Sequence, residues 1–208
     1  MTRPDGQTVE GRPVNTSGFH GLGGNIVLPP GADFKHQLLL NLWFDFKSDG
    51  TYVITSRLAR GIKLPNGDQL EPTSEVSRLL VRPRDPKRLE VVCRDILRQL
   101  EAWPNVEDEQ TMEPPPGQKL SYVDDPVAVP YLEQALHAHK VLTDEYAVAG
   151  LEKIGNDEAV QALLSGLRDT YGDIARLSRF ALVNLENRVT DPALKQKISR
   201  ALRAPGSN

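Results

Sequence analysis

The stretch Asp125-Pro-Val-Ala-Val-Pro-Tyr-Leu-Glu-Gln-Ala-Leu136 is followed by two related copies in the second half of the chain. They run Asn156-Asp-Glu-Ala-Val-Gln-Ala-Leu-Leu-Ser-Gly-Leu167 and Asp191-Pro-Ala-Leu-Lys-Gln-Lys-Ile-Ser-Arg-Ala-Leu202, at offsets of 31 and 35 residues. Each copy opens with Asp or Asn, which caps a helix by accepting a hydrogen bond from an unpaired backbone N–H. Pro130 lies inside the first copy, where its missing N–H predicts a kink or a tight first turn. Repeats with a period of about 20 to 50 residues indicate a solenoid.

The apolar positions of the three copies coincide. Leu132, Leu163 and Ile198 share one repeat position, so we expect Leu163 to be buried between helices. The segments between the copies also correspond to each other, with one charged exception. A second shared repeat position is occupied by Leu136, Leu167 and Leu202. In the segments between the copies, Ala147 corresponds to Ala181, Leu151 to Leu185 and Ile154 to the exception, Arg188.

At these residues the sequence resembles the HEAT-like repeat family, in the short bacterial form found in phycobilisome lyases. The segments that carry the resemblance are residues 120–132 and 149–160, and it covers about 85 residues from Lys119 to Arg203. It implies stacked antiparallel helix pairs with a concave, helix-lined binding face.

The first part of the chain has a different period. Residues Phe34 to Leu42 alternate between two faces, and further β-rich runs span Thr51–Leu58 and Val76–Val81. Turn residues separate the runs, with Asn66-Gly67 as the strongest turn signal. We expect each of these runs to be a strand.

These runs resemble the later strands of a bacterial immunoglobulin-like domain. The matching segments are Leu28-Pro-Pro-Gly31, Asn41-Leu-Trp-Phe-Asp-Phe46 and Asp49-Gly-Thr-Tyr-Val-Ile54. Tyr52 has the placement of a tyrosine corner, although an ordinary strand tyrosine is the alternative. The order of a sandwich followed by HEAT-like repeats is similar to that of large bacterial envelope proteins.

Only four or five strands fit between Thr2 and Val81, whereas a complete sandwich has about seven. One interpretation is that the first strands and a signal peptide precede the sequence given, and it predicts self-association through an uncovered sheet. The other is a naturally small sheet covered by a helix at Pro86–Ala102. The sequence upstream of Met1 would decide between them.

The expected fold class is α+β multidomain: a small, incomplete immunoglobulin-like β-sandwich followed by an α-helical HEAT-type solenoid. We place the β module at residues 1–83 and about three helix pairs at residues 119–204. Between them, residues 84–118 form a connecting helix and a proline-rich linker. Asp85-Pro86 predicts the start of that helix, which should end near Trp103-Pro104.

Composition excludes several classes of function. The 208-residue chain has a net charge of −3 with Lys and Arg spread along its length, so no basic field for nucleic acid is present. No apolar run reaches the roughly 18 residues of a membrane span. As written, the chain has no signal peptide and is expected in the cytoplasm; with an upstream signal peptide it would belong to the cell envelope or be secreted. Cys93, the single cysteine, is expected to be a buried structural thiol.

No catalytic, cofactor-binding or metal site is predicted. The glycine-rich run Phe19–Gly24 lacks the Gly-Lys-Ser/Thr of a phosphate-binding loop. His137 and His139 are two apart on a predicted helix and would point about 200° apart, which suits surface histidines better than metal ligands. The acidic runs Glu107–Glu109 and Asp124-Asp125 are expected to be solvated or structural.

The sequence therefore predicts a non-catalytic protein-binding scaffold with no cofactor and an unidentified protein partner. Solvent-facing positions of the second helix in each pair are the ones we expect to contact it. Two alternatives remain, a chromophore lyase-like or chaperone-like enzyme and a structural fragment of a larger envelope protein. The expected contact positions include Gln134, Gln161, Ser165 and Arg168.

Overall fold

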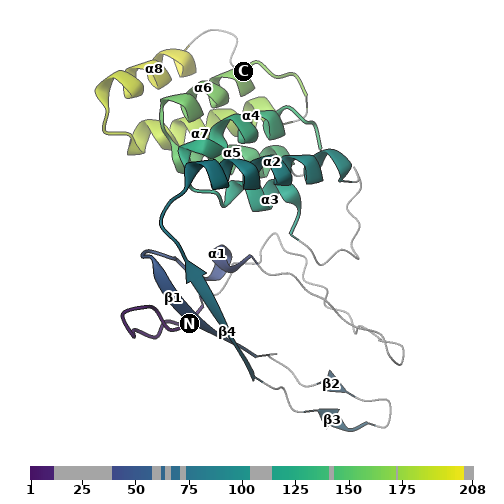
Figure 1. Ribbon diagram of the computed structural model, residues 1–208. Helices are drawn as coiled ribbons and strands as arrows, with labels where there is room; N and C mark the ends of the chain where they lie inside the picture. The colour runs from purple at the N-terminus through teal and green to yellow at the C-terminus, as the bar shows by residue number, and fades with distance from the viewer. Residues whose placement is uncertain are drawn as a thin grey trace. The chain divides into compact units, whose positions relative to one another are not determined.

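Two units make up the chain, and they meet in sequence at Arg84 and Asp85. We call the described residues up to Arg84 the strand unit and those from Asp85 onward the helical unit. The computed structural model describes residues 1–11, 39–57, 62–63, 67–70, 74–103, 114–140, 143–171 and 173–203 (Figure 1).

The helical unit is built from two layers of helices (Figure 1). Helices α3, α5 and α7 pack on one another in one layer, and α4, α6 and α8 pack in the other. Helix α2 covers the start of this array by packing on α3, η1 and α4. The arrangement is compatible with the predicted solenoid. The bounds are α2 Pro86–Ala102, α3 Pro116–Ser121, the 3₁₀ turn η1 Pro126–Ala128, α4 Val129–Leu136, α5 Thr143–Ile154, α6 Asp157–Gly166, α7 Ile174–Arg188 and α8 Pro192–Arg203.

The repeat positions form the core of the helical unit. Leu132, Leu163 and Ile198 are fully buried in one cluster, which confirms the prediction for Leu163. At the second repeat position Leu136 is buried, whereas Leu167 and Leu202 are partly buried against the same cluster. The repeat pattern in the sequence thus marks the residues that join the two layers.

The predicted helix starts are confirmed. Asp85 caps α2 by accepting a hydrogen bond from the Arg88 N–H at 3.2 Å, and Asn156 caps α6 by accepting one from the Ala159 N–H at 2.8 Å. Pro130 is the second residue of α4 and follows the 3₁₀ turn, so its missing N–H removes no helical hydrogen bond. Of the two predicted outcomes, a kink or a tight first turn, the structure shows the tight first turn.

Glycines let neighbouring helices approach closely. A Cβ added to Gly166 in α6 would lie 2.3 Å from Oγ of Ser178 in α7, which is too close for two atoms that are not bonded. A Cβ at Gly150 in α5 would lie 2.8 Å from the Leu132 side chain in α4. A side chain at either glycine would require the neighbouring side chain to move.

The predicted immunoglobulin-like β-sandwich is wrong. In the strand unit β1, Gly50–Arg57, pairs antiparallel with β4, Ser74–Val81, and the short β2, Ile62–Lys63, pairs with β3, Gln69–Leu70. Among the described residues each sheet has two strands, which cannot supply two facing sheets with a core between them. The predicted fold class, an α+β chain with a β-sandwich followed by a solenoid, is therefore wrong in its β part.

The strand predicted at Phe34–Leu42 is also wrong where it can be examined. Leu40–Trp43 forms the short helix α1, while residues 34–38 lie outside the described part. The strands predicted at Thr51–Leu58 and Val76–Val81 are confirmed as β1 and β4.

Tyr52 makes the hydrogen bond of a tyrosine corner without the sandwich. The side chain is fully buried, and its hydroxyl donates to the Ser48 carbonyl oxygen at 2.9 Å. Its ring packs edge-on against Phe46, with centroids 5.1 Å apart. The tyrosine therefore closes the turn before β1 locally.

Helix α2 belongs to the helical core. Its predicted span is confirmed, and its Cys93 and Leu100 are buried in the same cluster as the repeat leucines. Residues Pro116–Gln118, expected in the linker, begin α3 instead. None of the helices within the described ranges is long and apolar enough to cross a membrane.

Candidate functional site

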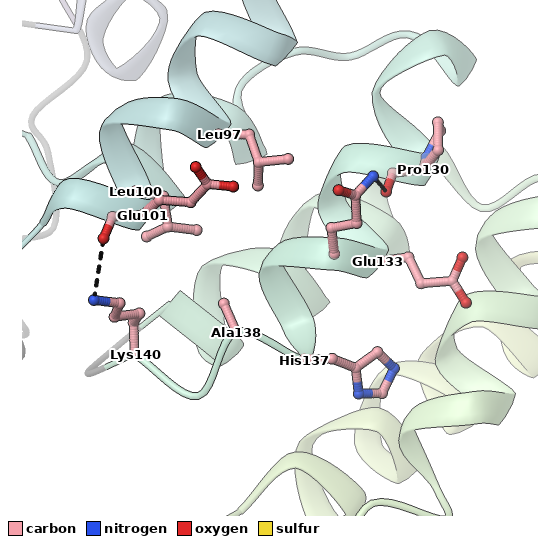
Figure 2. Close-up of a pocket in the computed structure, with 9 residues that line it drawn as sticks. Leu97, Leu100, Glu101, Pro130, Glu133, His137, Ala138 and Lys140 are labelled. Atoms are coloured by element: carbon pink, nitrogen blue, oxygen red, sulfur yellow. Dashed lines mark hydrogen bonds between the residues drawn. The ribbon is translucent and has the colours of Figure 1, made fainter.

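A cleft of about 740 Å³ lies between α2 and α4 (Figure 2). We call it the α2–α4 groove. The side chains that line it come from the last turns of α2, from α4 and from the residues that follow α4. They are Leu97, Leu100, Glu101, Pro130, Glu133, Gln134, His137, Ala138 and Lys140.

The apolar part of the groove follows from the way α2 packs. Leu100 is buried and Leu97 partly buried, because this face of α2 covers the first repeat. Opposite them α4 presents Pro130 and, just beyond its end, Ala138, both of which are exposed. These short side chains do not fill the space beside α2, so apolar surface stays open to solvent.

Lys140 closes one end of the groove. Its Nζ donates to the Trp103 carbonyl oxygen at 3.0 Å, and the Glu101 carbonyl oxygen lies at 3.5 Å. Trp103 is the residue after the last turn of α2, where backbone carbonyls lack helical partners and the helix dipole is negative. The ammonium therefore caps α2.

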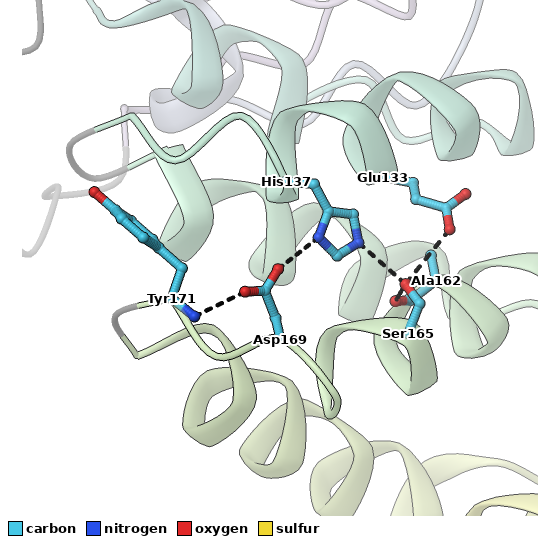
Figure 3. A network of polar contacts seen from close by, with 6 residues as sticks. All are labelled: Glu133, His137, Ala162, Ser165, Asp169 and Tyr171. Carbon is cyan, nitrogen blue, oxygen red and sulfur yellow. Dashed lines mark hydrogen bonds and ion pairs between the residues drawn. The ribbon is translucent and has the colours of Figure 1, made fainter.

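A polar network joins the first repeat to the second (Figure 3). His137 Nδ1 lies 2.7 Å from Asp169 Oδ2, and His137 Nε2 lies 3.2 Å from Ser165 Oγ. The other carboxylate oxygen of Asp169 accepts a hydrogen bond from the Tyr171 N–H at 2.8 Å. We call Ser165, His137, Asp169 and Tyr171 the inter-repeat network.

Serine, histidine and aspartate in this order are also the parts of a hydrolytic triad. The direction of the Ser165 hydroxyl proton therefore decides whether this serine can act as a nucleophile. Its nearest acceptor is the Ala162 carbonyl oxygen at 2.7 Å, closer than His137 Nε2. A Glu133 carboxylate oxygen lies 3.5 Å from the same hydroxyl and would repel a negative charge developing beside it. This geometry favours a structural link over a nucleophile.

No family model, curated protein or solved structure matches this chain. The function has to be inferred from the chain's own residues. Within the described ranges, no three His, Cys, Asp or Glu side chains gather as metal ligands would.

Two of the pKa shifts in the helical unit concern Asp169 of the inter-repeat network and the single cysteine, Cys93. Burial on its own would raise the pKa of Asp169, but the Tyr171 N–H, the His137 ring and the nearby His139 outweigh it, so the pKa lies below its ordinary value. The Asp169 carboxylate is therefore the stable form in the inter-repeat network. Burial, with the Asp125 charge nearby, raises the pKa of the Cys93 thiol to about 11, so this buried thiol stays protonated at neutral pH.

The residues expected to contact a partner lie on or just after α4 and α6, and one of them lines the α2–α4 groove. Gln134 is exposed in the α2–α4 groove and donates from Nε2 to the Pro130 carbonyl oxygen at 3.1 Å. Gln161 and Arg168 are exposed on and just after α6, whereas Ser165 is held in the inter-repeat network. Sequence reasoning thus located one residue of the groove.

His137, expected to be a plain surface histidine, has specific partners. His137 and Asp169 are 32 residues apart, which is close to the first repeat offset of 31. This spacing was the signal in the sequence that the two residues could meet between neighbouring repeats. His139 lies against the Tyr171 ring, with centroids 4.1 Å apart. Asp124 pairs with Lys153 at 3.2 Å, while residues 19–24 and 107–109 lie outside the described ranges.

Proposed function

We propose that the helical unit is a non-catalytic protein-binding module that holds a segment of a partner protein in the α2–α4 groove. The observation that carries this proposal is the open apolar surface formed by Leu97, Pro130 and Ala138 inside a cleft of about 740 Å³. Sites that bind a peptide segment are often apolar grooves into which the segment lays its apolar side chains. This groove has that composition.

The expected HEAT-like character supports the same proposal. Helical repeat arrays expose extended surfaces because each repeat contacts only its neighbours. Here α2 adds a groove at the start of the array, where it packs on α3, η1 and α4. We therefore place the binding site at this end instead of along the second helices of all three repeats.

An enzymatic role receives less support. The Ser165–His137–Asp169 arrangement has the composition of a catalytic site, but it directs the Ser165 proton toward the Ala162 carbonyl oxygen and places Glu133 beside the hydroxyl. A nucleophile needs its proton directed to the base and donors around the developing oxyanion. We therefore assign this cluster to the connection between repeats.

The test begins with peptides selected from a random displayed library against the full chain. Ala138→Trp should fill the groove and weaken binding of the selected peptides at least about tenfold, which corresponds to about 1.4 kcal/mol. The matched control is Ala149→Trp, because Ala149 is equally exposed on α5 but does not line the groove.

Equal affinity of the wild type and Ala138→Trp for all selected peptides would contradict the proposal. A separate arm incubates the chain with bilins, since the lyase-like alternative predicts a coloured complex. Circular dichroism of both tryptophan variants establishes that neither substitution unfolds the array.

A further inference from the structure

We infer that the α2–α4 groove selects a basic partner segment, in which apolar side chains are flanked by Lys or Arg. This inference rests on the proposed function and specifies its partner. It is carried by the charges around the groove and by the direction of the two helices that form it.

The groove is built from the C-terminal turns of two helices. Helix α2 contributes Leu97, Leu100 and Glu101 from its last six residues, and α4 contributes Glu133 and Gln134 from its last four. The C-terminal end of a helix carries a partial negative charge, which Lys or Arg in the last turn normally compensates. Neither α2 nor α4 has a basic residue there.

Each helix instead places a carboxylate at its negative end. Glu101 is in the last turn of α2, and Glu133 is in the last turn of α4 (Figure 2). The carboxylate of Glu101 has no ion pair with the described residues, and that of Glu133 has only the 3.5 Å contact from Ser165. A like charge at a helix terminus is unfavourable, so a cation from a partner would be stabilised by both the carboxylate and the dipole.

Lys140 and His137, which also line the groove, do not cancel this field. Lys140 is directed at the Trp103 and Glu101 carbonyl oxygens, where it offsets the dipole of α2, but it is one ammonium against the two carboxylates of Glu101 and Glu133. His137 is 2.7 Å from Asp169, so any positive charge on its ring is balanced by that carboxylate. Glu101 and Glu133 therefore leave the groove with an excess of negative charge.

The apolar lining decides what kind of cation fits. Leu97, Pro130 and Ala138 offer no hydrogen-bonding side chain, so a small hydrated cation would contact the carboxylates and leave this apolar surface open to solvent. A protein segment with leucine-like anchors would bury these surfaces, while its Lys or Arg side chains reach the two carboxylates at the rim. Charges at the rim mainly contribute to specificity and association rate.

Three synthetic peptides test the inference on the full chain by isothermal titration calorimetry. The first carries leucine and lysine, the second leucine and glutamate, and the third serine and lysine, all in the same pattern. We expect the leucine–lysine peptide to bind at least about tenfold more tightly than either of the others. Raising the salt concentration should weaken its binding.

A charge-neutral variant identifies the residues responsible. Glu101→Gln combined with Glu133→Gln should remove most of the preference for lysine over glutamate, and Glu101→Gln alone should remove part of it. The control pair is Glu145→Gln with Glu158→Gln, two exposed glutamates on α5 and α6 outside the groove, and it should retain the preference.

The outcomes separate the two proposals. If the leucine–lysine and leucine–glutamate peptides bind equally and Ala138→Trp blocks both, the groove binds protein but the basic preference is wrong. Equal binding of the serine–lysine peptide would also overturn the inference, because charge alone would then suffice. If none of the three peptides binds while the library-selected peptides bind and Ala138→Trp blocks them, the inference fails and the proposed function stands.

Discussion

The Nδ1 atom of His137 lies 2.7 Å from a carboxylate oxygen of Asp169, a residue 32 positions further along the chain. The histidine follows the last residue of α4, and the aspartate lies in the loop after α6. Their side chains are 36% and 12% exposed. The contact fixes the first repeat to the second next to the α2–α4 groove, which His137 also lines.

Asp169→Asn should lower the free energy of unfolding at neutral pH by about 1–2 kcal/mol, because it replaces a charged acceptor by a neutral amide. Urea denaturation followed by circular dichroism measures the loss. The matched control is Asp124→Asn, whose carboxylate is exposed and paired with Lys153, and it should lose much less. Equal losses in both variants would show that the inter-repeat network adds nothing.

The stabilisation by Asp169 should depend on pH in one direction. Because its pKa is below its ordinary value in the folded chain, the contribution is fully present above the unfolded value of about 3.9. It is lost as the pH falls through the lowered folded value. The difference in stability between wild type and Asp169→Asn should therefore shrink below about pH 4, and a difference that grows on acidification would contradict this assignment.

Leu163→Ala should cost about 2–5 kcal/mol of unfolding free energy, because the side chain is fully buried at the shared repeat position. Chemical denaturation gives the value. Gln161→Ala on the exposed side of the same helix serves as the control and should have little effect. A loss below about 1 kcal/mol at Leu163 would mean that the repeat register is wrong.

Lys140→Gln should loosen the last turn of α2, because the ammonium that caps the Trp103 carbonyl oxygen is removed. Hydrogen exchange should become faster for the backbone amides of that turn. Lys153→Gln, which removes an exposed ion pair with Asp124, should leave these rates unchanged. Unchanged exchange in Lys140→Gln would exclude the capping role.

Self-association is expected through the strand unit. Val76 and Leu80 of β4 are 61% and 56% exposed, and they lie on the same face, opposite Thr55 and Thr51 of β1. An exposed apolar strand surface tends to pair with another chain. Light scattering at several concentrations should show association that Val76→Lys with Leu80→Lys reduces and Val183→Lys does not. A wild type that stays monomeric throughout would contradict this expectation.

The sequence predicted the helical unit well because its signals are local and repeated. An Asp or Asn before each copy fixed the helix starts, and one apolar position in three copies identified Leu132, Leu163 and Ile198 as core. The α2–α4 groove was not predicted, because the apolar pattern of α2 does not indicate which helices it packs against. The link between His137 and Asp169 likewise depends on the stacking of two repeats.

The strand unit was predicted less well. The run around Leu40 contains consecutive leucines, and such a short apolar run fits a strand or a helix equally. The structure forms α1 there. Tyr52 is a second example of a local signal that does not determine the domain around it. Its hydrogen bond to Ser48 forms within one turn and does not require the immunoglobulin-like domain in which that bond is usual.

The close approach of Gly166 and Ser178 makes the effect of a substitution at one position depend on the residue at the other. Gly166→Ala as a first step would place its Cβ 2.3 Å from the serine hydroxyl. Ser178→Ala as a first step removes that atom, which has no hydrogen-bond partner among the described residues. The remaining neighbours would then lie at 3.2 Å, a tight contact that small shifts can relieve. Alanine at position 166 should therefore cost less stability when position 178 is alanine than when it is serine.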